Sequence, residues 1–207
     1  MQRLLDGVVQ FRKEDFEAHK DLFQNLGNSQ KPHTLFIGCS DSRVVPNMIT
    51  STLPGELFVV RNVANIVPRY RQTNEYVATT SAIEYALIQL EIENIVICGH
   101  SNCGGCQALY LSEDRLQQMP LTSKWLEQSH EVRDRVLAQI EPGHADERDW
   151  LTEQMNVVEQ MKHLLSYPFI LERYMDGKLN IHGWHYIIET GEIFAYSRDK
   201  GFFELIN

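Results

Sequence analysis

Two short motifs hold the side chains of this chain that are best suited to chemistry. The first is CSDSR at residues 39–43, and the second, about sixty residues later, is HSNC at residues 100–103. Between them they offer two thiols, an imidazole, a carboxylate and a guanidinium. Thiolates and imidazoles are ligands that zinc prefers in proteins. The motifs therefore predict a zinc site where the fold brings them together.

Each motif follows a short apolar run. Residues 33–38 precede Cys39, and residues 94–99 precede His100. Uninterrupted apolar runs of this length are typical of parallel strands that are buried on both faces. Open α/β sheets build their sites at the C-terminal ends of such strands, so we expect both motifs at the same edge of one sheet.

The spacing within each motif suits a shared centre. Residues i and i+2 lie on one side of an extended segment, so Cys39 and Asp41 can face the same point. His100 and Cys103 are three residues apart, which a turn or a first helical turn brings together. From spacing alone, Asp41 is either a catalytic carboxylate or a fourth ligand that closes the site.

With these residues in view, the sequence resembles the β-class carbonic anhydrases. Five blocks match that family in its order: CSDSR at 39–43, RNVAN at 61–65, AIEYA at 82–86, GHSNCGG at 99–105 and HGW at 182–184. The resemblance covers roughly residues 1–190. It implies a zinc enzyme, a lyase, that interconverts CO2 and bicarbonate.

The resemblance assigns roles to the motif residues. It implies one zinc ion per chain, held by Cys39, His100 and Cys103, with the fourth position open to water. Asp41 and Arg43 match the catalytic pair of the family. In this interpretation zinc-bound hydroxide attacks CO2, and Asp41 accepts the hydroxide's proton in a hydrogen bond. Arg43 keeps Asp41 ionised and off the metal.

The same resemblance implies where the substrate binds. A small apolar molecule such as CO2 needs an apolar pocket with few polar contacts. The resemblance implies Phe58, Val63 and Tyr85 as the lining. The Gln30 amide and the backbone N–H near Gly104 would orient CO2 or bicarbonate. Without the resemblance, we would assign the three lining residues to the core and Gln30 to a loop.

Other functions remain open from the sequence. Similar folds perform different chemistry, so the scaffold would also suit hydrolysis of CS2 or COS. The chain would be a non-catalytic zinc protein if Asp41 were a permanent fourth ligand. A redox role for the C-x-x-C of Cys103 and Cys106 fits less well, because it leaves Cys39 without a function. We expect Cys106 and Cys98 to pack in the core.

Three further histidines have a pKa range that suits a proton shuttle: His33, His182 and His185. The last two lie in or beside an expected strand, so structural hydrogen bonding is the better interpretation for them. The sequence does not assign the shuttle.

One branch of the resembled family has a regulatory pocket, which is incomplete here. There, bicarbonate binds beside a Trp three residues before the first zinc-binding Cys, together with an Arg and a Tyr, and favours an inactive state. Arg61 and Tyr186 match, but Phe36 stands at the Trp position and has no N–H to donate. We therefore expect Asp41 to be paired with Arg43 in the resting enzyme.

The order of elements predicts an α/β fold. We expect strands near 33–38, 56–60 and 94–98, and connecting helices near 43–51, 75–91 and 104–112. This alternation implies a mostly parallel central sheet flanked by helices. Later elements are expected to be helices at 122–140, 148–166 and 168–177, and a C-terminal antiparallel hairpin of 181–188 and 193–196.

The N-terminal residues are expected to form a helical arm. We predict a helix over residues 1–27 that breaks near Gly7 or Val8, and we assign 1–30 as the dimerisation arm of a single domain spanning 1–207. An amphipathic arm before the first strand has little to cover in its own chain. The resemblance implies exchanged N-terminal helices and active sites near the interface, so we expect a homodimer or a dimer of dimers.

Composition narrows the partners and the compartment. Lys and Arg number 19 and Asp and Glu number 28 in 207 residues, a net charge of −9, which argues against nucleic acid or an anionic membrane as a partner. No apolar run is long enough to span a bilayer, and the N-terminus does not resemble a secretory signal. Four cysteines make no disulfide framework, and thiolate zinc ligation favours a reducing compartment, so we expect a cytoplasmic location.

Overall fold

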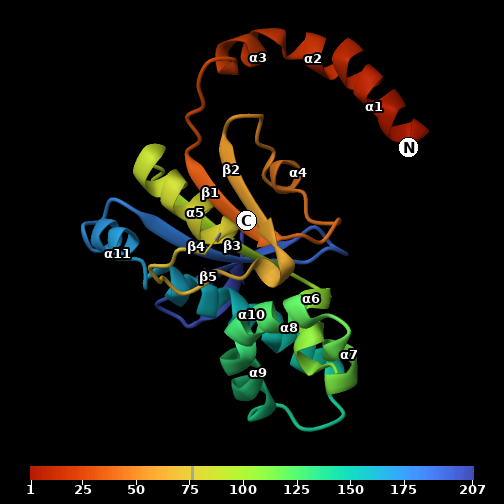
Figure 1. Cartoon of the computed structure of the whole chain (residues 1–207), viewed down its shortest axis with the longest axis vertical. Coiled ribbons are helices and arrows are strands. Elements are labelled where there is room, and N and C mark those ends of the chain that lie inside the picture. The colour runs from red at the N-terminus through yellow and green to blue at the C-terminus, as the bar shows by residue number, and fades with distance from the viewer. Residues whose placement is uncertain (76) are drawn as a thin grey trace.

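A six-stranded sheet forms the centre of the structure, which is a computed structural model that describes residues 1–75 and 77–207 (Figure 1). The strand order across the sheet is β2-β1-β3-β4-β5-β6. The strands are β1 (Thr34–Cys39), β2 (Leu57–Asn62), β3 (Asn94–His100), β4 (Asn180–Tyr186), β5 (Ile193–Ser197) and β6 (Phe202–Leu205).

The first four strands of this order are parallel, and β5 and β6 are antiparallel to their neighbours. All of β1 and nearly all of β3 is buried, which explains their uninterrupted apolar sequences. The predicted α/β class, mostly parallel sheet and C-terminal hairpin are confirmed. The sixth strand was not predicted, because four residues are too few to show an alternating pattern.

Among the residues that the structure describes, eight α-helices follow the N-terminal arm. They are α4 (Pro46–Thr50), α5 (Ala78–Glu84), α6 (Gly104–Gln107), α7 (Glu113–Gln117), α8 (Pro120–Leu126), α9 (His130–Leu137), α10 (Ala145–Leu164) and α11 (Pro168–Met175). Side chains of α5, α10 and α11 share one buried cluster with the sheet, whereas the opposite face meets Ile49 of α4. Within the described residues, no helix is both long and apolar enough to cross a bilayer.

Three of the helices predicted after the N-terminal arm are divided or shortened in the structure. The helix expected at 104–112 is α6 followed by a 3-10 turn (Ala108–Tyr110). The helix expected at 122–140 is α8, a 3-10 turn (Glu127–Ser129) and α9. The chain turns at Ser129, where the buried hydroxyl donates to Asn156 Oδ1 of α10 at 2.9 Å. The helix expected at 75–91 starts at Ala78 and ends in a π turn (Tyr85–Gln89). Residue 76 lies outside the described residues.

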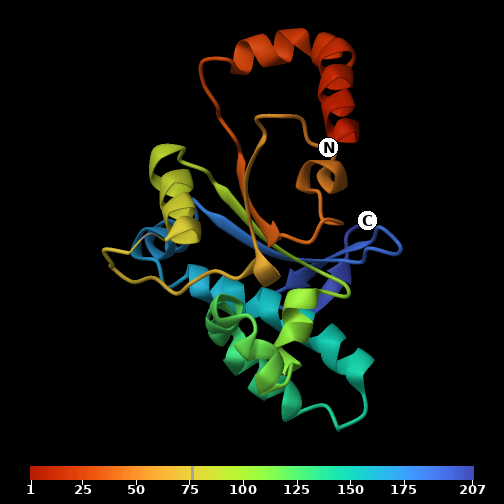
Figure 2. The ribbon, with the colours of Figure 1, turned by 45° about the vertical axis from the view of Figure 1, so that its right-hand side comes forward.

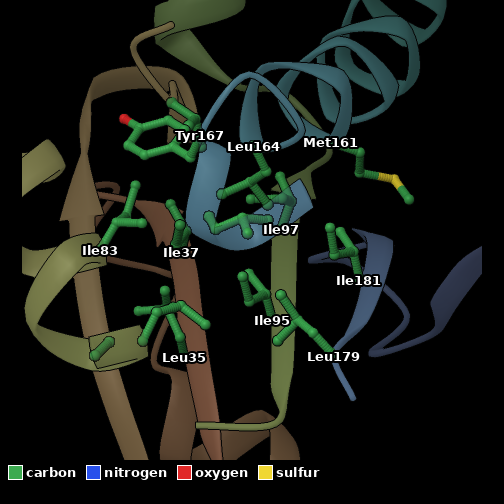
Figure 3. Packing of buried hydrophobic residues seen from close by; sticks show 14 of the residues in the cluster. Leu35, Ile37, Ile83, Ile95, Ile97, Met161, Leu164, Tyr167, Leu179 and Ile181 are labelled. Carbon is green, nitrogen blue, oxygen red and sulfur yellow. The ribbon is translucent and has the colours of Figure 1, made fainter. Parts of the chain in front are cut away.

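The main hydrophobic core lies between the sheet and this helical layer (Figure 3). Leu35 and Ile37 of β1 and Ile95 and Ile97 of β3 are fully buried there, together with Leu164 of α10. Alternate residues of two adjacent strands therefore face the same layer. Since a slip by one residue would turn all of these side chains to the opposite face of the sheet, this core fixes the register of β1 on β3 and the relative position of their C-terminal ends.

Helix α10 lies very close to the sheet where it crosses β3 and β4. A Cβ atom at Gly99 would lie 2.6 Å from Val157 Cγ2, and one at Gly183 would lie 2.5 Å from the Met161 sulfur. A larger residue at either glycine would force these side chains or the helix to shift. This close approach brings the N-terminal half of α10 next to the strand end that carries His100.

The N-terminal arm extends away from the sheet (Figures 1 and 2). It contains α1 (Gln2–Lys13), α2 (Asp15–Ala18) and α3 (Lys20–Leu26), none of which has a buried residue. The break predicted near Gly7 or Val8 is wrong, because α1 continues through both residues and a single helical glycine costs only about 1 kcal/mol. The breaks fall at residues 14 and 19, where the chain folds back into a cluster of three aromatic rings, Phe11, Phe16 and Phe23.

Candidate metal centre and active site

Cys39, His100 and Cys103 meet at the C-terminal edge of the sheet. Cys39 is the last residue of β1, His100 is the last residue of β3, and Cys103 directly precedes α6. One sulfur or nitrogen atom of each lies within 4.8 Å of the others, and all three residues are buried. No other group of three His, Cys, Asp or Glu side chains converges in this way within residues 1–75 and 77–207.

A hydrogen bond orients the imidazole of His100. The Nδ1 atom lies 2.9 Å from the carbonyl oxygen of Ser101, to which it donates its proton. The other ring nitrogen, Nε2, is buried and has no hydrogen-bond partner in the part of the chain that the structure describes. A buried polar atom without a partner needs an explanation. An Nε2 lone pair available to a metal ion supplies one, because the outer hydrogen bond of a ligating histidine has this form.

The two thiols have a spacing that suits zinc. Their sulfur atoms lie 3.9 Å apart, and a tetrahedral centre with Zn–S bonds of about 2.3 Å separates two sulfurs by about 3.8 Å. The donor set and its spacing therefore fit a zinc ion.

In the absence of a metal, the pKa values of all three ligand groups are raised. A hydrogen bond with Cys103, together with burial, raises the pKa of Cys39 to about 12. A hydrogen bond with the Cys106 thiol, together with burial, raises the pKa of Cys103. Burial lowers the pKa of His100, but its interactions with the nearby Cys39 thiol and the Ser101 carbonyl outweigh burial and raise it. A metal ion must displace these protons, so binding weakens in acid.

Asp41 and Arg43 form a bidentate ion pair beside the three ligands. Arg43 Nε donates to Asp41 Oδ1 at 2.9 Å and Nη2 donates to Oδ2 at 2.8 Å. The side-chain hydrogen bonds from Arg43 hold the pKa of Asp41 well below its ordinary value. Asp41 Oδ2 also lies 3.9 Å from His100 Nε2. An ionised carboxylate therefore stands next to the converging ligand atoms.

Two arginines donate hydrogen bonds to backbone carbonyl oxygens of the two motifs. Arg43 Nη2 also donates to the carbonyl oxygen of Asn102 at 3.0 Å, which links the first motif to the second. Arg61 of β2 donates to the carbonyl oxygens of Cys39 at 2.9 Å and Asp41 at 2.6 Å. The guanidinium of Arg61 is thus engaged by the backbone that carries the first ligand.

Glu189, in the turn between β4 and β5, was not predicted from the sequence. Its carboxylate accepts hydrogen bonds from Ser101 Oγ at 2.9 Å and Asn102 Nδ2 at 2.7 Å. It therefore holds the loop between His100 and Cys103. No local pattern could have found it, because the contact joins residues 87 positions apart and a glutamate in a hairpin turn is ordinary.

Glu153 of α10 was also not predicted from the sequence. This buried carboxylate contacts the backbone N–H of Cys103 and the ring of His185. A signal was present, because Val157 and Met161 follow at helical spacing and place Glu153 on the apolar face, where a charge is rare. The structural hydrogen bond expected for His185 is confirmed.

Two of the five predicted substrate residues lie close to the ligands. Gly104 directly follows Cys103 and begins α6, and nothing lies within 4 Å of where its Cβ would be. Val63 packs against Gly105 and is exposed on its outer side. The carbonyl oxygen of Val63 accepts a hydrogen bond from Trp125 Nε1 at 2.9 Å.

The other three, Gln30, Phe58 and Tyr85, gather elsewhere. The Phe58 and Tyr85 rings lie 6.0 Å apart, and Gln30 and Tyr85 line one shallow cavity. Phe58 pairs with Leu35, four residues before Cys39, a separation of about 13 Å at 3.3 Å per residue. A single chain therefore does not bring all five residues around one centre, and their shared role stays a prediction.

The two cysteines that were not predicted to bind zinc lie in the core, as expected. Cys98 and Cys106 are buried free thiols in the core. Phe36 is also fully buried and meets Trp184 edge to face, with ring centroids 6.3 Å apart. The Phe36 ring therefore has no polar group to offer at the position of the regulatory Trp.

Comparison with known proteins places these features in a family. A family model described as carbonic anhydrase matches residues 34–193. The carbonic anhydrase of Helicobacter pylori is 42% identical over 203 residues, which cover 97% of this chain and 92% of that protein. A carbonic anhydrase of Synechocystis is 42% identical over 196 residues, which cover 95% of this chain and 71% of that protein.

Solved structures agree with the sequence matches. The β-carbonic anhydrase CcaA aligns with a TM-score of 0.93 at 40% identity, covering 100% of this chain and 99% of that one. A β-carbonic anhydrase of Sordaria macrospora, described as tetrameric, aligns with a TM-score of 0.79 at 30% identity, covering 94% of this chain and 95% of that one. The chain belongs to the β-carbonic anhydrase family, whose members are lyases.

Proposed function

We propose that this chain binds one zinc ion through Cys39, His100 and Cys103 and catalyses the reversible hydration of CO2 to bicarbonate and a proton. The observation that carries the proposal is the convergence of two thiols and an unpartnered imidazole nitrogen within 4.8 Å. The names of the relatives support the reaction, and they favour CO2 over CS2 or COS as the substrate.

Three protein ligands are typical of a catalytic zinc site, which keeps one position open. When bound, zinc lowers the pKa of a coordinated water and so supplies a nucleophile at neutral pH. The chain itself positions the metal ion and keeps bulk solvent away from its ligands. The buried ligands hold the metal at the sheet edge, and their low exposure limits competing contact with solvent.

Asp41 is the group that orients the reacting species. Its carboxylate is ionised and lies beside His100, so it accepts a hydrogen bond from a proton donor bound between the ligands and CO2. Arg43 occupies both carboxylate oxygens and so restrains Asp41 from moving onto the metal. This pairing favours a catalytic role over the alternative in which Asp41 permanently closes the site.

A second copy of the chain is proposed to complete the substrate pocket. Phe58 lies about 13 Å along the sheet from its own Cys39, by the register of β1 on β2. Tyr85 lies beside Phe58, and Gln30 shares a cavity with Tyr85, so these three residues form one group away from the ligands. Tyr85 and Val63 are both well exposed in one chain. A dimer that places Gln30, Phe58 and Tyr85 of one chain over the partner's metal centre would cover the exposed side chains of both Tyr85 and Val63. The tetrameric Sordaria enzymes show that related chains also form larger assemblies.

The thiol ligands also indicate the cellular compartment in which the enzyme works. Cys39 and Cys103 must stay reduced to bind zinc, and a reducing compartment keeps such thiols free. We therefore place the enzyme in the cytoplasm.

Two serine variants test the proposed zinc ligands: one replaces a proposed ligand, and the other replaces a nearby cysteine that is not a ligand. Cys103→Ser should lose zinc and activity, because a hydroxyl stays protonated where a thiolate is needed. Cys106→Ser, three residues further along, changes a buried thiol outside the ligand set and should keep both. Zinc per chain is measured by atomic absorption on purified protein. Equal loss of zinc from both variants, or retention by both, would show that the ligands are assigned wrongly.

A further inference from the structure

Glu153 is a buried charge that the reaction described above does not use. Its side chain is 2% exposed, and it lies on α10 behind Cys103. Oε1 accepts a hydrogen bond from the backbone N–H of Cys103 at 3.0 Å. Oε2 lies 3.1 Å from His185 Nε2. The two oxygens of one carboxylate therefore join a ligand backbone to a histidine on the neighbouring strand β4.

The backbone N–H of Cys103 has no partner in secondary structure. Cys103 is the residue before the first turn of α6, with an extended backbone (φ −73°, ψ 109°). Its N–H precedes the helix and points away from the helical ladder. A buried N–H without an acceptor costs about 1–3 kcal/mol, so Glu153 stabilises this particular conformation of the ligand residue.

His185 supports Glu153 from the other side. The imidazole is fully buried, and its ring meets Trp150 edge to face at 4.8 Å. Phe203 lies on it at 6.2 Å. In the described part of the chain its Nδ1 atom has no hydrogen-bond partner. Because a carboxylate oxygen accepts hydrogen bonds, Nε2 is assigned as the donor to Glu153.

The close approach of α10 to the sheet makes these contacts possible. A Cβ at Gly99 would lie 2.6 Å from Val157 and 3.5 Å from the Glu153 carbonyl oxygen. Glycine at this position lets the helix descend until the Glu153 carboxylate reaches the backbone of Cys103. The arrangement is thus built by three elements, α10, β4 and the loop before α6.

We propose that Glu153 is a positioning residue for the metal centre, and that His185 orients it. The proposal rests on the zinc site proposed above. Glu153 fixes the peptide of Cys103 so that its sulfur faces Cys39 before the metal binds. Its contact with the metal is indirect, through the ligand backbone. Burial of both Glu153 and His185 excludes them as a direct proton route to solvent.

Glu153→Gln tests the proposal with little change in shape. An amide has one acceptor and one donor end, so it cannot accept hydrogen bonds from both Cys103 and His185. Loss of such an outer contact typically weakens metal binding about 10–100-fold. The zinc dissociation constant is measured by competition with a chromophoric chelator. Cobalt substitution adds a spectroscopic readout, because altered thiolate geometry changes the absorption bands.

The matched control is Glu159→Gln on the same helix. Glu159 is equally buried, with 3% side-chain exposure, but it pairs with Arg135 and other cations rather than with a ligand. Zinc affinity of this variant should stay within about twofold of the parent, because distant sites act independently. Its unfolding midpoint should fall, since a buried ion pair is lost.

A second pair of variants covers the case in which Glu153→Gln does not fold. His185→Gln places an amide N–H near the position of Nε2 and should keep most of the zinc affinity. His185→Phe removes the donor while keeping a ring between Trp150 and Phe203, and it should weaken zinc binding by several-fold. Rescue by Gln but not by Phe is the signature of an orienting hydrogen bond.

The outcomes separate this proposal from the one on which it rests. If the parent protein does not bind one zinc ion per chain, the proposed function fails. If the parent binds zinc but Glu153→Gln binds it within about twofold, with an unchanged cobalt spectrum, only the positioning role fails. Equal weakening in Glu153→Gln and Glu159→Gln would likewise assign Glu153 to general stability and overturn the proposal.

Discussion

Asp41 receives three hydrogen bonds from one residue. Two come from the guanidinium of Arg43 and one from its backbone N–H. This arrangement leaves the carboxylate ionised and fixed in direction. A residue held so firmly beside a metal centre is suited to orient a proton rather than to move between states.

Asp41→Asn should therefore keep zinc and lose turnover. The amide cannot pair with Arg43 as a carboxylate does, and it accepts a proton less strongly. A loss of roughly 10²–10⁴-fold in kcat is expected, the usual contribution of a positioned acid–base group. Stopped-flow CO2 hydration, with zinc content measured on the same sample, checks it. Near-parental turnover across the pH range would remove Asp41 from the reaction.

The residues of the site could be predicted from the sequence only where the pattern is local. Cys39 and Asp41 share one motif, and His100 and Cys103 share another, so their convergence followed from two strand ends. Glu153 could not be assigned a partner in this way. Its acceptor role depends on how closely α10 packs on β3, which no spacing within the helix reveals.

At the scale of elements, α10 carries two buried carboxylates with different tasks. Glu153 contacts the backbone of Cys103 and the ring of His185, whereas Glu159 accepts hydrogen bonds from Arg135 and Lys162 and contacts His163. Arg135 connects α10 to α9, and Arg69 Nη2, which donates to Glu159 Oε1 at 3.2 Å, connects α10 to the chain after β2. The interaction with His163, followed by that with Arg135, lowers the pKa of Glu159.

Glu159→Gln should destabilise the protein in a pH-dependent way. A carboxyl group whose pKa is lowered on folding stabilises the protein above its unfolded pKa, here near 4.5, and this contribution is lost as pH falls through the folded value. The free energy of unfolding at pH 7 should fall by about 1.5–3 kcal/mol. The difference from the parent should shrink steadily below pH 4.5. Urea unfolding at several pH values measures this, and a difference that stays constant down to pH 3 would contradict the assignment.

The bounds of a helix or strand could be predicted best where burial leaves a simple pattern of apolar residues in the sequence. The strands near 33–38 and 94–98 were expected within a residue or two of β1 and β3, because each is a continuous apolar run. The helix expected at 122–140 is divided in the structure. Its division depends on a hydroxyl of Ser129 that meets Asn156 of α10, and such a long-range contact leaves no periodic signal.

At the scale of the whole molecule, the N-terminal arm is the least covered part. Leu4 is 69% exposed and Val8 is 60% exposed, although α1 is clearly amphipathic. The aromatic rings of Phe11, Phe16 and Phe23 pack on one another and shape the arm without anchoring it to the sheet. An apolar surface of this kind is typical of a protein interface.

Removal of residues 1–26 should therefore disrupt the assembly. The expected result is dissociation, or aggregation through surfaces that the arm covers in the partner. Sedimentation analysis of the truncated and parent proteins at equal concentration checks this. A soluble monomer with full activity after truncation would show that neither the arm nor a second subunit is needed for the site.

The proposed assembly is the feature that a single sequence could predict least. The sequence indicated an arm, and the family resemblance implied a set of pocket residues, but neither showed that Phe58 lies about 13 Å along the sheet from Cys39. That separation emerges only when the register of β1 on β2 is known. It is a property of the sheet as a whole rather than of any motif.

The central claim is that zinc held by Cys39, His100 and Cys103 makes this chain a CO2 hydratase. Stopped-flow CO2 hydration, before and after removal of the metal by a chelator, tests it most directly. Protein with one zinc ion per chain should accelerate hydration, lose that acceleration when zinc is stripped, and regain it when zinc is restored. Turnover that persists after complete removal of zinc, or no hydration by fully loaded protein, would contradict the account.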